Sequence, residues 1–225
     1  MAVDRVDLVE NVTQGGQEPA QWFARPGLAA APTIDTHPDT GIWYDPEAAL
    51  EELGMALADL GLASVDELPA ITLMHNTSEG HARIATAIQQ MWVEELGLEV
   101  QVANQEWSVY LDLLDEDPPQ IFRLGWCPDY ADVHNFTADV FMSTSGNNHT
   151  NYASEEFDAL VTAAAVEQDY ETRRDMYAQA EEMLVYEDAA IIPLYWYTSV
   201  NMTKPGVERT YSINGNQSYE KWDLK

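Results

Sequence analysis

The residues from 71 to 126 alternate between strand and helix patterns, and this alternation leaves few architectures open to the chain. Short apolar runs are typical of strands, and an apolar stripe at helical spacing indicates a helix. The predicted order is strand, helix, strand, helix, strand over residues 71–74, 79–96, 98–102, 107–114 and 120–126. Because such crossovers join parallel strands, the pattern predicts an α/β fold whose largely parallel or mixed sheet is flanked by helices.

The residues before this region are predicted to be less regular. Residues 1–12 have a helical pattern with a poor beginning, because nothing before Asp4 can cap the helix well. Residues 14–43 are rich in Gly, Pro, Ala and Thr, which predicts a long irregular stretch. Asp45 followed by Pro46 then predicts a helix that ends near Leu60.

The last third of the chain is predicted to be helical until residue 186. One helix has Phe157 and Val161 on its apolar face, and a second runs from about Glu171 to Tyr186. Residues 191–200 form a β-rich run around Pro193. Its aromatic residues alternate faces, so at least one of the three at 195–197 must point away from the core.

The charge balance excludes several classes of partner. The chain has 39 acidic and 10 basic residues, a net charge of -29, with 46% hydrophobic residues for a core. Such a surface repels nucleic acid and anionic lipid, and it fits a protein exposed to salt. A single cysteine, Cys127, allows no internal disulfide. We find no apolar run of membrane-spanning length, and the residues after Met1 have no signal-peptide pattern.

The predicted sheet gathers polar groups at one edge. Ligands of open parallel sheets bind beyond the carboxyl ends of the strands. Here this edge receives the loops 76–81, 105–107 and 127–132, which carry His81, Trp107 and Asp129, together with Arg123 from the third strand. A carboxylate binds an ammonium, a guanidinium or imidazolium binds a carboxylate, and an indole packs an apolar chain. These groups together are suited to hold a zwitterion.

Each of these residues also has a structural interpretation. Arg123 can form a salt bridge with a neighbouring carboxylate, and Asp129 can cap a turn or the following helix. His81, at a helix start, can simply be solvated, and Trp107 can belong to the core.

Other chemistries find little support. The five histidines lack metal-ligand spacing, and we find no nucleophile elbow, phosphate-binding loop or dinucleotide motif. Asp129 and Asp132 form a pair that can in principle run acid–base hydrolysis, but close acidic pairs are expected by chance among 39 acidic residues. We therefore expect a binding protein without catalysis, metal or cofactor.

Several sequence runs together resemble the peptide-binding proteins of oligopeptide ABC importers, which belong to the extracellular solute-binding proteins of family 5. The runs follow in order over essentially the whole chain, and their number makes the resemblance specific. They lie at residues 4–5, 9–13, 16–17, 19–20, 76–81, 104–112, 125–130, 146–148, 192–197 and 204–205.

The resemblance implies roles for particular residues in holding a short peptide. Asp129 would anchor the α-ammonium of the peptide, and Arg123 and His81 would meet its carboxylate. Side-chain pockets would be lined by Trp107 and Tyr197. Backbone groups around Gly125 and Cys127 would pair with the extended peptide as an added strand.

The resemblance also implies that the chain is the carboxy-terminal half of a longer protein. Residues 1–198 would form one peptide-binding lobe, and 199–225 would return toward a missing amino-terminal lobe. The full-length protein would be periplasmic or on the cell surface, and it would deliver peptides to an ABC permease. The alternatives are a dipeptide, nickel-complex or haem binder on the same scaffold, or an inactive fragment.

Overall fold

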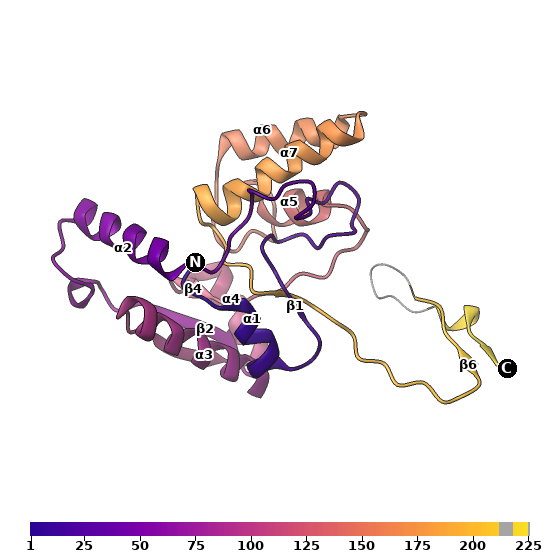
Figure 1. The fold of residues 1–225 in the computed structure, drawn as a ribbon, viewed down its shortest axis with the longest axis horizontal. Helices are drawn as coiled ribbons and strands as arrows, with labels where there is room; N and C mark the ends of the chain where they lie inside the picture. The colour runs from indigo at the N-terminus through magenta and orange to yellow at the C-terminus, as the bar shows by residue number, and fades with distance from the viewer. Residues whose placement is uncertain (212–217, 225) are drawn as a thin grey trace. The chain divides into compact units, whose positions relative to one another are not determined.

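The computed structural model describes residues 1–211 and 218–224. The chain divides into two compact units (Figure 1). The sheet unit comprises Met1–Gln21 and Ile42–Gly125, and the helical unit comprises Trp22–Gly41 and Trp126–Lys225. The expected division at residue 198 stays a prediction. Among the described residues, no helix combines the length and the apolarity that a bilayer crossing requires.

A three-stranded parallel sheet forms the centre of the sheet unit. Its strands are β2 (Thr72–Asn76), β3 (Gln101–Gln105) and β4 (Ile121–Phe122), in the order β3-β2-β4. Leu73 of β2 pairs with Val102 on one side and with Ile121 on the other. The helices between the strands are α3 (Glu79–Leu96) and α4 (Trp107–Glu116). The prediction of an α/β fold with a parallel sheet is therefore confirmed.

Helix α3 supplies much of the core of this unit, and Figure 1 shows it beside β2. Ile84, Ile88 and Trp92 are buried at helical spacing, and each contributes about 1.5–3 kcal/mol by leaving water. The helix ends at Gly97, whose φ of 64° is left-handed and costs glycine little. Both predicted ends of α3 are confirmed, although Ser78 at the cap position makes no side-chain capping bond.

Two predicted strands differ in extent from the observed ones. The second begins at Gln101 rather than at residue 98, because the Leu98 amide still bonds to the carbonyl of Trp92 and closes helix α3. The third is assigned only at Ile121–Phe122 rather than over 120–126. One further bond, from the Arg123 amide to the Met74 carbonyl at 2.8 Å, continues its pairing with β2.

The first helix corrects an expectation. Helix α1 (Arg5–Asp7) continues into the π-helix η1 (Leu8–Thr13). Asp4 caps it, accepting bonds from the amides of Val6 and Asp7 at 2.9 Å each. The prediction of a poorly capped start was therefore wrong, because Asp4 itself is the cap.

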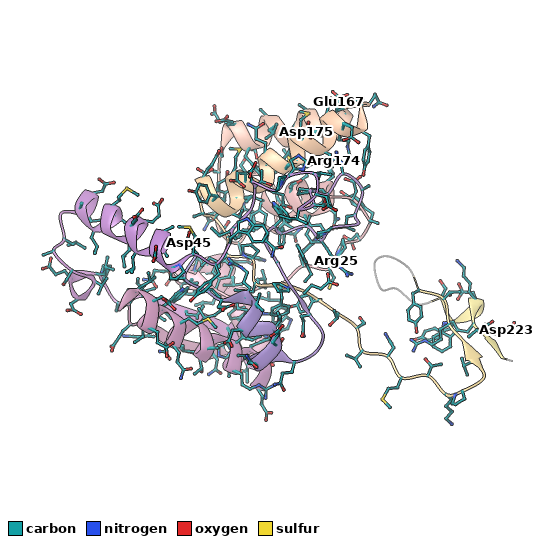
Figure 2. All side chains as sticks on the ribbon, viewed as in Figure 1. Arg25, Asp45, Glu167, Arg174, Asp175 and Asp223 are labelled. Atoms are coloured by element: carbon teal, nitrogen blue, oxygen red, sulfur yellow. The ribbon has the colours of Figure 1, made fainter. Side chains whose placement is uncertain are left out.

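The rest of the sheet unit follows the predicted pattern. Helix α2 (Pro46–Leu60) begins after Asp45, whose carboxylate accepts a 3.0 Å bond from the Ala48 amide (Figure 2). Short elements complete the unit, namely β1 (Glu18–Pro19) and the 3-10 helix η2 (Val65–Glu67).

Helices dominate the other unit. They are α5 (His134–Phe141), α6 (Glu155–Val166) and α7 (Tyr170–Glu182), which continues as the π-helix η3 (Met183–Glu187). Figure 1 shows α6 and α7 side by side, and their packed residues include the fully buried Phe157, Val161 and Tyr177. The short remaining elements are β5 (Tyr195–Trp196), β6 (Val207–Glu208), η4 (Tyr219–Lys221) and β7 (Asp223–Leu224).

Acidic side chains near the end of α7 hold the irregular segment 22–41. Glu181 is fully buried and accepts bonds from the amides of Phe23 and Ala24, at 2.8 Å each. Its neighbour Glu182 accepts a 2.6 Å bond from the Gly41 amide. Burial raises the pKa of Glu181 to about 7. The two ends of a segment without regular structure are thus fixed by adjacent carboxylates.

Candidate functional site

Arg123 is held at the carboxyl edge of the sheet by its main chain. Its amide donates to Met74, and its carbonyl oxygen accepts a 2.7 Å bond from the hydroxyl of Tyr110. Tyr110 is buried, and this desolvation raises its pKa to about 12, so the hydroxyl stays protonated as a donor. The Arg123 side chain is half-buried. Helix α4 thus fixes the position from which the guanidinium extends.

His81 lies in the first turn of α3, within the electrostatic reach of Arg123. The pKa of His81 is lowered, first by burial and then by the positive charge of Arg123. Its Nδ1 atom and the Oδ1 atom of Asn76 are both buried without a hydrogen-bond partner among the described residues. The interpretation of His81 as a merely solvated residue was therefore wrong. The sheet unit brings together Arg123 and His81, the two residues predicted to meet a carboxylate.

Trp107 begins α4 and is 47% exposed. Its ring stacks on that of Tyr110, with 6.2 Å between centroids and 26° between planes. The interpretation of Trp107 as a core residue was therefore wrong, and its indole offers an open aromatic face. Gly125, the last residue of the sheet unit, is also exposed.

Asp129 belongs to the helical unit, in a loop that we call the anchor loop (residues 126–130). Its side chain is exposed, and its carboxylate has no hydrogen-bond or ion-pair partner within the described part of the chain. The capping interpretation of Asp129 was wrong, because Asp132 accepts the bond from the His134 amide at 2.9 Å as α5 begins. Cys127, in the same loop, carries an exposed thiol.

Two residues of α5 that sequence reasoning missed hold the anchor loop. Asn135 is fully buried, and its Oδ1 atom accepts bonds from the indole of Trp126 at 2.7 Å and from the amide of Asp129 at 3.2 Å. Asp139 accepts bonds from the Asn135 amide group and from the Tyr130 hydroxyl, both at 2.8 Å. The only signal in the sequence was an Asn and an Asp at positions i and i+4 of a helix.

Asp132 is committed to an ion pair. Its two oxygens bind the guanidinium of Arg173 at 2.8 and 3.0 Å, and Arg173 also lies over the ring of Tyr177 at 4.9 Å. The hydroxyl of Tyr177 in turn lies 3.0 Å from Nδ1 of His134. This network ties the start of α5 to α7. It gives Asp132 a structural role, which weakens the hydrolytic alternative.

The aromatic run at residues 195–197 divides as its alternation predicts. Trp196 is half-buried and donates from its indole to the carbonyl of Phe23 at 3.2 Å. Tyr197 is 46% exposed and packs edge to face on Tyr195, with 5.6 Å between ring centroids. Tyr197 is thus the member of the run that is accessible from solution.

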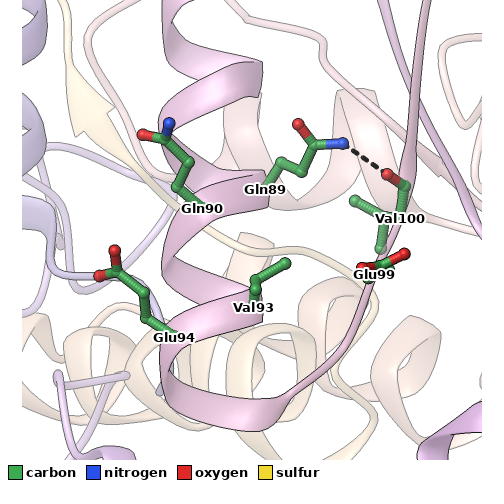
Figure 3. Close-up of a pocket in the computed structure, with 6 residues that line it drawn as sticks. All are labelled: Gln89, Gln90, Val93, Glu94, Glu99 and Val100. Atoms are coloured by element: carbon green, nitrogen blue, oxygen red, sulfur yellow. Dashed lines mark hydrogen bonds between the residues drawn. The ribbon is translucent and has the colours of Figure 1, made fainter.

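A shallow pocket of about 440 Å³ lies elsewhere on the sheet unit (Figure 3). It is bordered by α3 and the residues before β3, where Gln89 donates to the carbonyl of Val100 at 2.6 Å. This is the amino end of β3, opposite the edge where ligands of parallel sheets bind, and no predicted site residue lines it. Within residues 1–211 and 218–224, no cluster of three or more His, Cys, Asp or Glu side chains is arranged to hold a metal ion.

Comparison with solved structures defines the class of protein first. The murein tripeptide binding protein MppA of *Escherichia coli* is similar over 99% of this chain and 43% of its own, with a TM-score of 0.82 and 27% identity. The *Haemophilus influenzae* OppA, solved in complex with RPPGFSPFR, is similar over the same shares, with a TM-score of 0.78 and 27% identity. The fold is thus that of periplasmic solute-binding proteins.

Sequence comparison then gives the family. Residues 1–148 match the family described as bacterial extracellular solute-binding proteins, family 5 Middle. The oligopeptide-binding protein OppA of *Bacillus subtilis* is 36% identical over 201 residues, which cover 88% of this chain and 36% of that relative. The chain belongs to the extracellular solute-binding proteins of family 5, and it spans about a third of the length of the curated relatives it matches.

Proposed function

We propose that this chain is the peptide-binding part of the substrate-binding component of an oligopeptide ABC importer. Its family and its similarity to proteins named for oligopeptide and murein tripeptide binding support this function. The protein would bind short peptides and deliver them to a membrane permease outside the cytoplasm, without making or breaking a bond.

The α-ammonium of the peptide binds to Asp129 in this proposal. The supporting observation is an exposed carboxylate without a protein partner among the described residues, on a loop that three hydrogen bonds to α5 hold in place. A carboxylate that is already placed gains a charge-assisted hydrogen bond without the cost of ordering a flexible loop. This single observation carries the proposal for the chain's own chemistry.

Arg123 and His81 bind the carboxylate of the peptide. Burial and Arg123 keep the pKa of His81 below its usual range, so His81 is largely neutral at pH 7 in the free protein. An incoming carboxylate reverses this effect because an opposite charge favours the protonated imidazole. The unsatisfied Nδ1 atom of His81 supports the role, since a buried polar atom without a partner is costly until a ligand supplies one.

The remaining candidate residues give the site its tolerance of sequence. Trp107 and Tyr197 each expose nearly half of their surface, and they line pockets for peptide side chains. Backbone groups of Gly125 and Cys127 pair with the extended peptide, so affinity comes from the main chain while roomy pockets accept many side chains. Residues 1–198 act as one lobe, and 199–225 return toward an amino-terminal lobe that closes over the peptide. Residues 212–217 and 225 of this return segment lie outside the described residues.

A thermal-shift titration with a pool of di- to pentapeptides tests the proposal. A ligand at a hundredfold excess over Kd stabilises the folded state by about 2.7 kcal/mol. We expect a rise in Tm for the unaltered chain and its loss in Asp129→Ala. Asp35→Ala, which removes another exposed carboxylate of the helical unit, is the control and should keep the rise.

The outcomes separate the alternatives. A rise that survives Asp129→Ala would contradict the anchor, and a rise that only metal or haem produces would favour another ligand on the same scaffold. If the peptides do not change Tm, the same titration is repeated with an amino-terminal lobe of the family added as a separate chain. An unchanged Tm in that experiment would refute peptide binding.

A further inference from the structure

The anchor loop contains three groups that bond to α5. They are the indole of Trp126, the main-chain amide of Asp129 and the hydroxyl of Tyr130. The first two donate to Oδ1 of Asn135, and the third donates to Asp139. Two side chains one helical turn apart therefore fix the loop from its first residue to its last.

The bonding pattern determines the orientation of the Asn135 amide. Its oxygen faces two donors, and its nitrogen faces the Asp139 carboxylate at 2.8 Å. Turning the amide over would set donors against donors and an acceptor against an acceptor. Asn135 and Asp139 thus act as one unit, in which the carboxylate of Asp139 orients the amide that binds the loop.

A fully buried asparagine needs a reason, because burying an amide is unfavourable unless its polar atoms find partners. Here these partners are the indole of Trp126, the amide of Asp129 and the carboxylate of Asp139. The Asp129 carboxylate is the one charged group that the loop leaves exposed. The network therefore holds the loop while sparing the group that a cation would bind.

We propose that Asn135 and Asp139 are positioning residues, which hold the anchor loop so that the Asp129 carboxylate is presented to the α-ammonium of a peptide. This inference rests on the proposed function, and it adds two residues that do not themselves touch the peptide. Preorganised support of this kind is what keeps a binding group within a narrow range of positions.

An exchange of the two side chains tests this role without changing the net charge. Asn135→Asp alone sets two carboxylates against each other and removes the donor to Asp139. Asp139→Asn alone leaves an amide without a carboxylate to orient it. The double variant Asn135→Asp/Asp139→Asn restores the contacts. The new carboxylate accepts from the loop, and the new NH₂ group, in place of the oxygen that Asn135 and Tyr130 share, donates to this carboxylate and to the Tyr130 hydroxyl oxygen.

The single cysteine of the chain provides a direct readout of loop order. Cys127 lies in the anchor loop with an exposed thiol, so a nitroxide attached to it reports loop mobility by electron paramagnetic resonance. We expect a restricted spectrum in the otherwise unaltered chain, a mobile one in each single variant, and a restricted one again in the double variant. Asn148→Ala, which removes bonds to the carbonyls of Phe141, Met142 and Tyr152, is the matched control and should leave the spectrum restricted.

Peptide affinity then tests whether the clamp, which consists of Asn135 and Asp139, matters for binding. For the unlabelled proteins, the ratio of affinities for a free tripeptide and its N-acetylated form should fall about tenfold in each single variant and recover in the double variant. A loss of overall stability would lower the affinity for both peptides equally and leave this ratio unchanged.

The two readouts keep the inference separate from the proposed function. An unchanged nitroxide spectrum in the single variants, or an equal change in Asn148→Ala, would overturn the clamp even if peptides bind. The inference would also be overturned if the affinity ratio in the single variants were the same as in the unaltered chain. A third outcome is that the single variants lose loop order as predicted, but neither peptide binds when the amino-terminal lobe is supplied. This result would refute peptide binding and the presentation of Asp129, whereas the role of Asn135 and Asp139 in holding the anchor loop would stand.

Discussion

Replacing Glu181 with glutamine should destabilise the fold at pH 5 and not at pH 8. Glu181 is fully buried and accepts two backbone bonds at 2.8 Å, from Phe23 and Ala24. The glutamine amide retains one acceptor oxygen and sets its NH₂ group against the other donor. An unsatisfied buried donor costs about 1–3 kcal/mol, and this cost applies at every pH.

An opposing effect depends on pH. Burial raises the pKa of Glu181 from 4.5 to about 7, so the folded chain holds its proton more tightly than the unfolded chain does. The contribution of Glu181 to the free energy of unfolding is therefore full below about pH 4.5, and it falls as the pH rises to about 7. The shift corresponds to a penalty of about 3 kcal/mol at pH 8. Glutamine does not ionise and escapes this penalty.

The two effects together predict a change of sign. Glu181→Gln should lower the free energy of unfolding by about 1–3 kcal/mol at pH 5. At pH 8 the variant should equal or exceed the unaltered chain in stability. Urea unfolding at both pH values and constant ionic strength, followed by tryptophan fluorescence, measures the difference. Because other carboxylates titrate in both proteins, the comparison isolates Glu181.

Glu156→Gln is the matched control, since Glu156 is an exposed glutamate of α6. It should change the free energy of unfolding by less than about 0.5 kcal/mol at either pH. The same loss of stability at pH 5 and pH 8 in Glu181→Gln would refute the reasoning, because it would mean that Glu181 does not change its ionisation in the folded chain between these values.

Three further predictions follow from charge and hydrogen bonding. With 39 acidic and 10 basic residues, Tm should rise as NaCl is increased, and a flat response would contradict self-repulsion. A peptide carboxylate should raise the pKa of His81, so the protein should take up protons when a peptide binds near pH 6.5. Titration calorimetry in two buffers detects this uptake, and His81→Gln should abolish it. Arg173→Lys should lower the free energy of unfolding in urea by about 1–3 kcal/mol, because lysine loses the paired bonds to Asp132. The control Arg174→Lys (Figure 2 shows Arg174) should lower it by less than about 1 kcal/mol, because its partner Glu171 is exposed.

The sequence predicted the elements whose ends are set by local chemistry. Helix α3 ends where Gly97 takes a left-handed conformation, and helix α2 begins where Asp45 caps its first turn. Asp4 is a counterexample, because the cap was sought before it although Asp4 itself fills that position. The carboxyl-edge rule also placed Arg123 near His81, since it depends only on strand order.

The sequence did not reveal contacts between residues that lie far apart along the chain. It also did not reveal which single side chains are buried or exposed. Glu181 bonds to Phe23, 158 positions away, and an acidic residue on a helix is ordinarily expected in solvent. Asn135 was not predicted as a site residue, because nothing local marks an asparagine as buried. A core position was one interpretation of Trp107, but this residue begins a short helix whose first turn is exposed.

The most direct test of peptide binding compares a free tripeptide with its N-acetylated form by isothermal titration calorimetry. The chain would be titrated together with an amino-terminal lobe of the family, so that both walls of the proposed site are present. The account predicts that the free peptide binds and that acetylation weakens binding about tenfold or more, through loss of the charge-assisted bond to Asp129. Equal affinity for both peptides, or no heat with either, would contradict it.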